Sequence, residues 1–187
     1  SASAYLSRTP TVTSNQKTWT WSGWLKRGAL ASSTYYEIFG AASSSATVIY
    51  FYNDAFSFQI TDSGGTTIGN ISTSAVFRDP ASWYHVVAVL DTTQATSTNR
   101  AKLYINGVQQ SLTFTTTPSQ NADARINSSS YPHYIGGRST LYYDGYMAEI
   151  NFIDGQALTP SSFGETDSIT GVWKPKKYAG TYGTNGF

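Results

Sequence analysis

Apolar side chains recur at every second position over much of this chain, and this repeat restricts the possible folds more than any other feature. In "KTWTWSGWLKR", Trp19, Trp21 and Leu25 fall on one face of an extended strand, while Trp24 and Lys26 fall on the other. We expect the first face to enter a core and note that Trp24 is an aromatic residue on an otherwise polar face. The 3.6-residue repeat of amphipathic helices is almost missing from the sequence.

Turn signals divide the chain into short strands. Asn53-Asp54 and Asn106-Gly107 each separate two apolar runs and predict tight hairpins. "WYHVVAVLD" is apolar on both faces, which is typical of a central strand covered on both sides. About ten short strands at this spacing predict an all-β fold, a two-sheet antiparallel β-sandwich of the jelly-roll kind. The single helical signal is a Thr-Pro pair that predicts one short turn near residues 159–164.

Charge and composition exclude several classes of function. The formal net charge is +1 and charged residues make up only 12% of the chain, so neither nucleic acid nor membrane insertion is expected. The sequence has no cysteine, which rules out disulfides, thiol catalysis and thiolate metal sites. Aromatic residues reach 15%, with 14 tyrosines, more than a core of this size requires.

Three stretches together resemble the concanavalin A-like lectin/glucanase superfamily, and its laminin G-like branch most of all. They are "TWSGWLKRG", "WYHVVAVLDTT…AKLYINGV" and "IGG…YDGYMAEINFIDGQALTPSSF". The matching positions are Trp83, His85, Tyr104, Asn106, Gly107, Gly145, Glu149, Ala157, Leu158 and Thr159. The resemblance covers most of residues 5–163 and implies two antiparallel sheets, one of them concave, with ligands held in the concave groove or at the loop rim.

We divide the chain into a laminin G-like sandwich over residues 1–165 and an extension over residues 166–187. The extension either packs on the sandwich or leads to a further module. Its ending, "GVWKPKKYAGTYGTNGF", resembles segments of tail and fibre proteins of tailed phages. We therefore expect the chain to be part of a longer virion or extracellular protein.

The sequence Glu149-x-Asn151-x-x-Asp154 resembles the Glu-x-Asp-x-x-Glu of sugar-cleaving jelly-roll enzymes, but it lacks their second carboxylate. A retaining glycosidase needs two carboxylates roughly 5–5.5 Å apart. Glu149 and Asn151 share a strand face, yet an amide can be neither nucleophile nor acid, and Asp154 falls on the opposite face before a turn glycine. We therefore assign no catalytic residue. Glu149 and Asn151 either satisfy neighbouring polar groups or hold a ligand.

Tyrosine clusters are the candidate ligand contacts, because a sugar stacks its C–H face on an aromatic ring while polar groups bind its hydroxyls. We predict a rim surface that joins Tyr142, Tyr143 and Asp144 to the loop of Tyr131 and His133. The alternative is that Tyr142 or Tyr143 turns into the core. Trp24, Glu149 and Asn151 complete the predicted ligand-binding set, and "SSTYYEIFG" places Tyr35 and Tyr36 near Glu37 as a further cluster.

Metal and histidine chemistry is weakly indicated. No cofactor is required and no metal ligand is assigned; calcium is possible, because Asp54, Asp62 and Asp91 lie in turns or at a strand end. Turn aspartates, however, commonly bind their own backbone. We expect His85, inside a strand, to make a structural hydrogen bond, and we expect His133 to lie in an exposed loop.

These observations favour a non-catalytic module that recognises carbohydrate or adheres to a surface. Its expected partners are a cell-surface or extracellular glycan and other modules or subunits of a parent particle. The alternative is a purely structural or decoration module without a glycan ligand, and a glycoside hydrolase of the glucanase type comes third.

Overall fold

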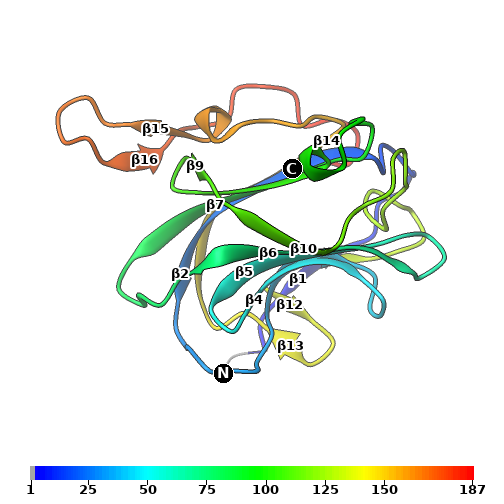
Figure 1. Ribbon diagram of the computed structural model, residues 1–187, viewed down its shortest axis with the longest axis horizontal. Helices are drawn as coiled ribbons and strands as arrows, with labels where there is room; N and C mark the ends of the chain where they lie inside the picture. Colours follow the sequence, from blue (N-terminus) through cyan, green and yellow to red (C-terminus); the bar gives the residue numbers. More distant parts are fainter. Residues whose placement is uncertain (1–2) are drawn as a thin grey trace.

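Two antiparallel sheets pack face to face, and a thinner third layer covers one of them (Figure 1). The computed structural model describes residues 3–187. The larger sheet contains, in spatial order, β1 (Leu6–Arg8), β11 (His133–Ile135), β3 (Tyr36–Ala41), β4 (Thr47–Tyr52), β5 (Ala55–Thr61), β6 (Thr67–Val76) and β10 (Leu112–Thr116). The smaller sheet contains β14 (Gly145–Asp154), β2 (Thr18–Arg27), β7 (Trp83–Asp91), β8 (Ala101–Ile105) and β9 (Val108–Gln109). Two short ribbons pair β12 (Gly137–Arg138) with β13 (Leu141–Tyr142) and β15 (Gly164–Thr166) with β16 (Trp173–Pro175).

The core lies between the two sheets and follows the two-residue repeat of the sequence. Trp19, Trp21 and Leu25 of β2 are fully buried, as predicted. The indole of Trp19 meets the ring of Phe58 edge-on, with centroids 5.2 Å apart. Phe58 belongs to β5 in the opposite sheet, so aromatic side chains from both sheets interdigitate. The all-β two-sheet sandwich predicted from the sequence is confirmed.

Both predicted hairpins form with the backbone that a two-residue β-turn needs. Asn53 and Asp54 have φ of 48° and 65°, and Asn106 and Gly107 have φ of 49° and 81°. Two successive residues with positive φ match the twist of the flanking strands, which explains why asparagine, aspartate and glycine occupy these places. These turns fix the registers of β4 with β5 and of β8 with β9.

Helix is limited to two short 3-10 turns among residues 3–187, η1 (Ser97–Asn99) and η2 (Pro160–Ser162). The second is the turn predicted near residues 159–164, with proline at its start. Thr159 precedes it, but its side chain makes no capping hydrogen bond and contacts Ser161 instead. Within the described part of the chain, no helix is long and apolar enough to cross a membrane.

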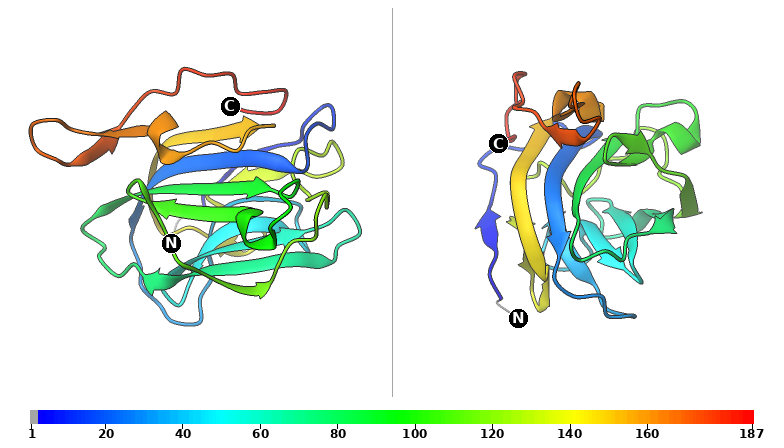
Figure 2. Two further views of the ribbon diagram at one scale, coloured as in Figure 1. Left: turned by 45° about the horizontal axis from the view of Figure 1, so that its top comes forward. Right: turned by 90° about the vertical axis from the view of Figure 1, so that its left-hand side faces the viewer.

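The segment after β14 forms the third layer, which runs over the outer face of the five-stranded sheet (Figure 2). Its aromatic residues build a second, smaller core there: Phe163 stacks on Tyr178 at 5.2 Å between ring centroids, over Val87 and Val89 of β7. The strand β7 is thus covered on both faces, as its sequence predicted.

Backbone hydrogen bonds tie the end of this segment to the free side of β14. Phe187 and Phe152 exchange N–H···O bonds of 3.0 and 2.9 Å, and the amide of Asp154 donates to the carbonyl of Tyr182 at 2.9 Å. The last residues therefore continue the hydrogen-bonding pattern of the sheet beyond its outermost strand.

Candidate functional site

The tyrosine pair after β12 divides between surface and core. Tyr143 is only 8% exposed and belongs to the main core, so its place in the predicted ligand surface was wrong. Burial is the main cause that shifts the pKa of Tyr143, and it raises this pKa well above the ordinary value. Tyr142 points outward and donates its hydroxyl to the carbonyl of Ser139 at 2.6 Å. Neighbours in an extended chain point to opposite sides, which is the alternative that the sequence left open.

His133 is buried in β11, so the prediction that it lies in an exposed loop was also wrong. Its Nδ1 lies 3.0 Å from the carbonyl oxygen of Tyr131 and its Nε2 accepts the amide of Asn127 at 2.9 Å. Burial lowers the pKa of His133 to about 4. The ring is therefore neutral and both of its nitrogens are used within the protein.

The remaining members of the predicted rim have separate surroundings. Tyr131 carries the guanidinium of Arg125 at 4.7 Å from its ring centre, before β11 begins. Tyr142 lies beyond the other end of β11, where its ring is 6.3 Å from that of Tyr5. The carbonyl of Asp144 accepts the amide of Gly28 at 2.8 Å. The structure does not assemble the five rim residues into one surface.

The three polar residues of β14 have three different roles. Asn151 donates to the carbonyl of Glu149 at 2.9 Å and accepts the hydroxyl of Tyr182 at 3.1 Å, so it holds the third layer in place. Asp154 is buried and accepts bonds from Ser14 at 2.6 Å and Asn127 at 2.8 Å. Glu149 is exposed at a β-bulge, with φ of 51°. A carboxylate pair of the glucanase kind is not formed by these residues.

The outer face of the seven-stranded sheet carries the better candidate site. Cross-strand pairing lines up Glu37, Tyr50, Ser57 and Ser72 in one row over β3, β4, β5 and β6. These side chains alternate with core residues along their strands, so they point away from the interior. Three of the four are buried, with exposed fractions of 3% for Glu37, 7% for Tyr50 and 5% for Ser57, and Ser72 is half-buried.

Glu37 is the acidic residue at the centre of this face. It is only 3% exposed, and its Oε1 accepts a bond of 2.8 Å from Arg138. Its Oε2 has no hydrogen-bond partner among the described residues. Burial raises the pKa of Glu37 to about 7, although the positive charge of Arg138 opposes the shift. This unpartnered oxygen is itself buried, and a buried acceptor without a hydrogen bond is unfavourable.

Tyrosine rings lie around Glu37. Tyr35 is 43% exposed and stacks on Tyr52 with ring centroids 4.5 Å apart. It also lies 5.3 Å from the ring of Tyr50, whose pKa burial raises to about 12. The three rings form an aromatic surface beside Glu37, and "SSTYYEIFG" was the sequence signal for it. Tyr36, which was grouped with them, is instead a core residue.

This face has binding chemistry without a second catalytic acid. Glu37 is the one carboxylate residue within the seven strands of the sheet. A glycosidase needs a second carboxylate near the first. The arrangement can therefore hold hydroxyl groups and stack a sugar ring, but it does not supply the acid and nucleophile for cleavage.

The turn aspartates have partners within the protein. Asp54 binds Arg27 at 2.9 Å and Arg78 at 2.8 Å, so both of its oxygens face cations. Asp62 accepts the amide of Thr66 in its own turn, and Asp91 accepts hydrogens from Thr93 and Gln94. Among residues 3–187, no group of three or more histidine or acidic side chains is close enough to hold a metal ion.

Comparison of the sequence with known families agrees with the sandwich and the placement of its motifs. The profile of the concanavalin A-like lectin/glucanase superfamily, in a laminin G form, matches residues 1–162. The chain belongs to this superfamily. No curated protein sequence matches it.

Solved structures share the fold of this laminin G-like chain. A heptameric SAP-like pentraxin from Limulus polyphemus is 17% identical, with a TM-score of 0.55, over 83% of this chain and 71% of the pentraxin. A protein from Bacteroides ovatus, assigned as a carbohydrate binding protein, is 16% identical with a TM-score of 0.59, over 84% of this chain and 42% of its own. The LG4-5 domains of mouse laminin α1 are 13% identical with a TM-score of 0.56, over 96% and 45%. The chain spans less than half of the last two, and at such identities the likeness establishes the fold alone.

Proposed function

We propose that this laminin G-like chain is a non-catalytic, carbohydrate-recognising module of a larger extracellular or virion protein. The carrying observation is the outer face of the seven-stranded sheet, where Glu37 keeps one carboxylate oxygen unpartnered among the described residues and Tyr35 and Tyr52 stack beside it. Sugars present apolar C–H faces and hydroxyl groups, which match an aromatic surface and a carboxyl group that can form hydrogen bonds.

Relatives support the ligand class in a general way. One structural neighbour is assigned as a carbohydrate binding protein, and another is the binding domain of a botulinum neurotoxin, of serotype G. The virion or extracellular setting, with other modules of the parent protein as partners, rests on the sequence resemblance.

A glycan array tests the proposal with three proteins. We expect wild type to bind a subset of oligosaccharides, and Tyr35→Ala and Glu37→Gln each to weaken part of that binding roughly tenfold, since an aromatic contact or a charged hydrogen bond is removed. Val108→Ala, an exposed apolar change on β9, is the matched control. Binding that Tyr35→Ala and Glu37→Gln leave unchanged would contradict the assignment of this face.

Two other outcomes would replace the proposal. A wild type that binds no glycan would favour the purely structural module. Release of reducing ends from β-glucans by the wild type, lost in Glu37→Gln or Glu149→Gln with the fold intact, would establish the glucanase instead.

A further inference from the structure

A pocket lies on the outer face of the five-stranded sheet, beside the ribbon of β15 and β16. It is lined by Trp24, Trp83, Ala148, Glu149 and Pro175. In the outer face of the five-stranded sheet, Trp24 of β2 stands between Ala148 of β14 and His85 of β7. Pro175 belongs to β16, so the pocket is built jointly by the sheet and the C-terminal ribbon.

The aromatic wall of this pocket is held rigidly. Trp24 stacks on His85 at 5.1 Å, and His85 stacks on Trp173 at 5.9 Å. The indole N–H of Trp173 donates to Nδ1 of His85 at 2.9 Å, and the other ring nitrogen is 2.9 Å from the hydroxyl of Ser22. Since all three rings are fixed, Trp24 offers a pre-arranged surface. Trp83 adds a ring that is 40% exposed.

Glu149 lines this pocket from a strained stretch of backbone. Glu149 has φ of 51°, in a region that residues with side chains seldom occupy, at a bulge where β14 shifts register against β2. Within residues 3–187 its carboxylate forms no salt bridge or hydrogen bond. Backbone strain of this kind persists where the surroundings impose it, and it is concentrated at functional sites.

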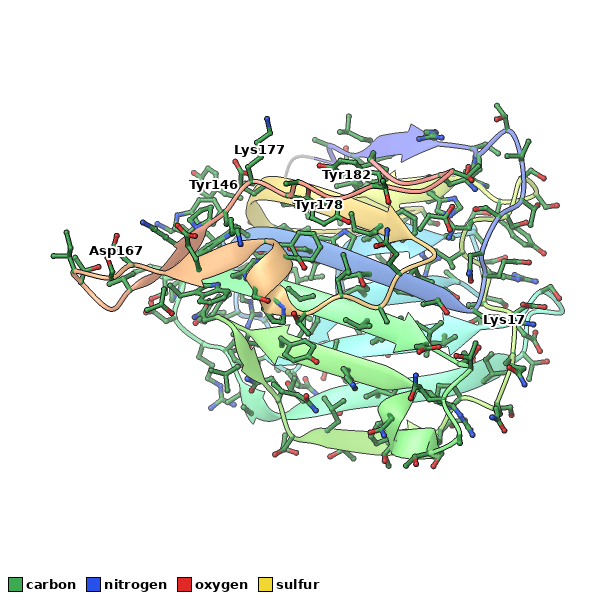
Figure 3. The ribbon with its side chains drawn as sticks, turned by 90° about the horizontal axis from the view of Figure 1, so that it is seen from above. Lys17, Tyr146, Asp167, Lys177, Tyr178 and Tyr182 are labelled. Atoms are coloured by element: carbon green, nitrogen blue, oxygen red, sulfur yellow. The ribbon has the colours of Figure 1, made fainter. Side chains whose placement is uncertain are left out.

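A positively charged residue, Lys26, lies next to the aromatic wall. Lys26 pairs with Trp83 and with Tyr146 in the same outer face. Tyr146 is strongly exposed, and Figure 3 shows it beside the path of the segment that carries Lys177. One acceptor and one donor thus border an apolar surface. This combination suits a ligand with an apolar face and several hydroxyl groups.

We propose that the pocket of Trp24, Trp83 and Glu149 binds a pyranose ring of a neutral glycan. The ring stacks on the indoles, Glu149 accepts hydroxyl hydrogens, and Lys26 donates to a ring or hydroxyl oxygen. This site is separate from the Glu37 face and lies on the opposite side of the sandwich. A single chain with both sites can bridge two glycan chains.

An array of neutral oligosaccharides, probed with the full chain, separates the two sites. The proteins are wild type, Tyr35→Ala, Trp83→Ala and the double variant, with Val108→Ala as the exposed apolar control. We expect Tyr35→Ala to keep a set of spots that Trp83→Ala weakens by roughly tenfold or more. Glu149→Gln keeps the shape of the pocket and should weaken the same set. The melting temperature of each variant reports on folding, and Trp83 is exposed enough for its removal to leave the fold intact.

The results assign failure to one site or the other. If Tyr35→Ala abolishes every spot, or if Trp83→Ala and Glu149→Gln both bind as wild type does, the second site is overturned while the first remains. If Tyr35→Ala binds as wild type and Trp83→Ala abolishes every spot, the first site fails and the second remains. A wild type that binds none of these glycans overturns the second site.

Discussion

Two buried histidines set the response of stability to pH. Burial lowers the pKa of His85 and of His133 to about 4, so the unfolded chain binds more protons than the folded one between that value and the ordinary 6.5. We expect the contribution of each histidine to the free energy of unfolding to be fully present above pH 6.5. This contribution should fall by roughly 3 kcal/mol per histidine as pH drops to 4.

Glu37 acts in the opposite direction. Its raised pKa of about 7 gives a contribution that is present below its ordinary value of 4.5 and is lost as pH rises through 7. Two histidines outweigh one glutamate, so urea unfolding between pH 4.5 and 6.5 should show stability rising with pH. Glu37→Gln should steepen the rise. A flat profile for both proteins would show that the two rings are accessible to protons.

Glu149 carries both the backbone strain of the bulge and a proposed ligand contact. Glycine adopts a φ of 51° without a Cβ clash. We therefore expect Glu149→Gly to stabilise the fold by about 1 kcal/mol and to weaken glycan binding at the Trp24 pocket. Chemical denaturation measures the first effect, and Glu149→Gln separates the loss of charge from the relief of strain. A destabilised Glu149→Gly would mean that the bulge is not strained.

At the scale of elements, two glycines make room for the indole that anchors the C-terminal ribbon. A Cβ on Gly164 would lie 2.5 Å from a ring carbon of Trp173, and one on Gly107 would lie 3.0 Å from another. We expect Gly164→Ala to destabilise by roughly 1–3 kcal/mol, because the indole must shift away from His85. In a Trp173→Ala background the same change should cost almost nothing. An equal cost in both backgrounds would show that the crowding involves a different neighbour.

The elements also show which features a sequence can predict. Period-two alternation identified Trp19 and Trp21 as core, because β2 keeps its register with β7 through these residues. The alternation did not predict the orientation of Glu37, because a register shift in β3 turns both Ile38 and Phe39 inward. Burial of His133 depends on the backbone of Asn127, whose position follows from the packing of a long loop. The bulge at Glu149 could not be predicted, because no glycine or asparagine occupies the position with positive φ.

For the whole molecule, the disposition of the acidic residues determines the expected response to chelation. Asp54 is neutralised by two arginines, and Asp62 and Asp91 bind their own turns. We expect EDTA to change neither the melting temperature nor glycan binding. Added calcium that raises the melting temperature of chelated protein by several degrees would contradict this and would reveal a rim site.

The pairing of the last residues with β14 bears on self-association. An outermost strand with free N–H and C=O groups can recruit a strand from another copy, which leads to aggregates. Here Phe187 and Tyr182 occupy those groups at Phe152 and Asp154, and the bulge at Glu149 interrupts the strand further along. The C-terminal residues thus block the addition of a further strand at these positions, and we expect their removal to promote aggregation.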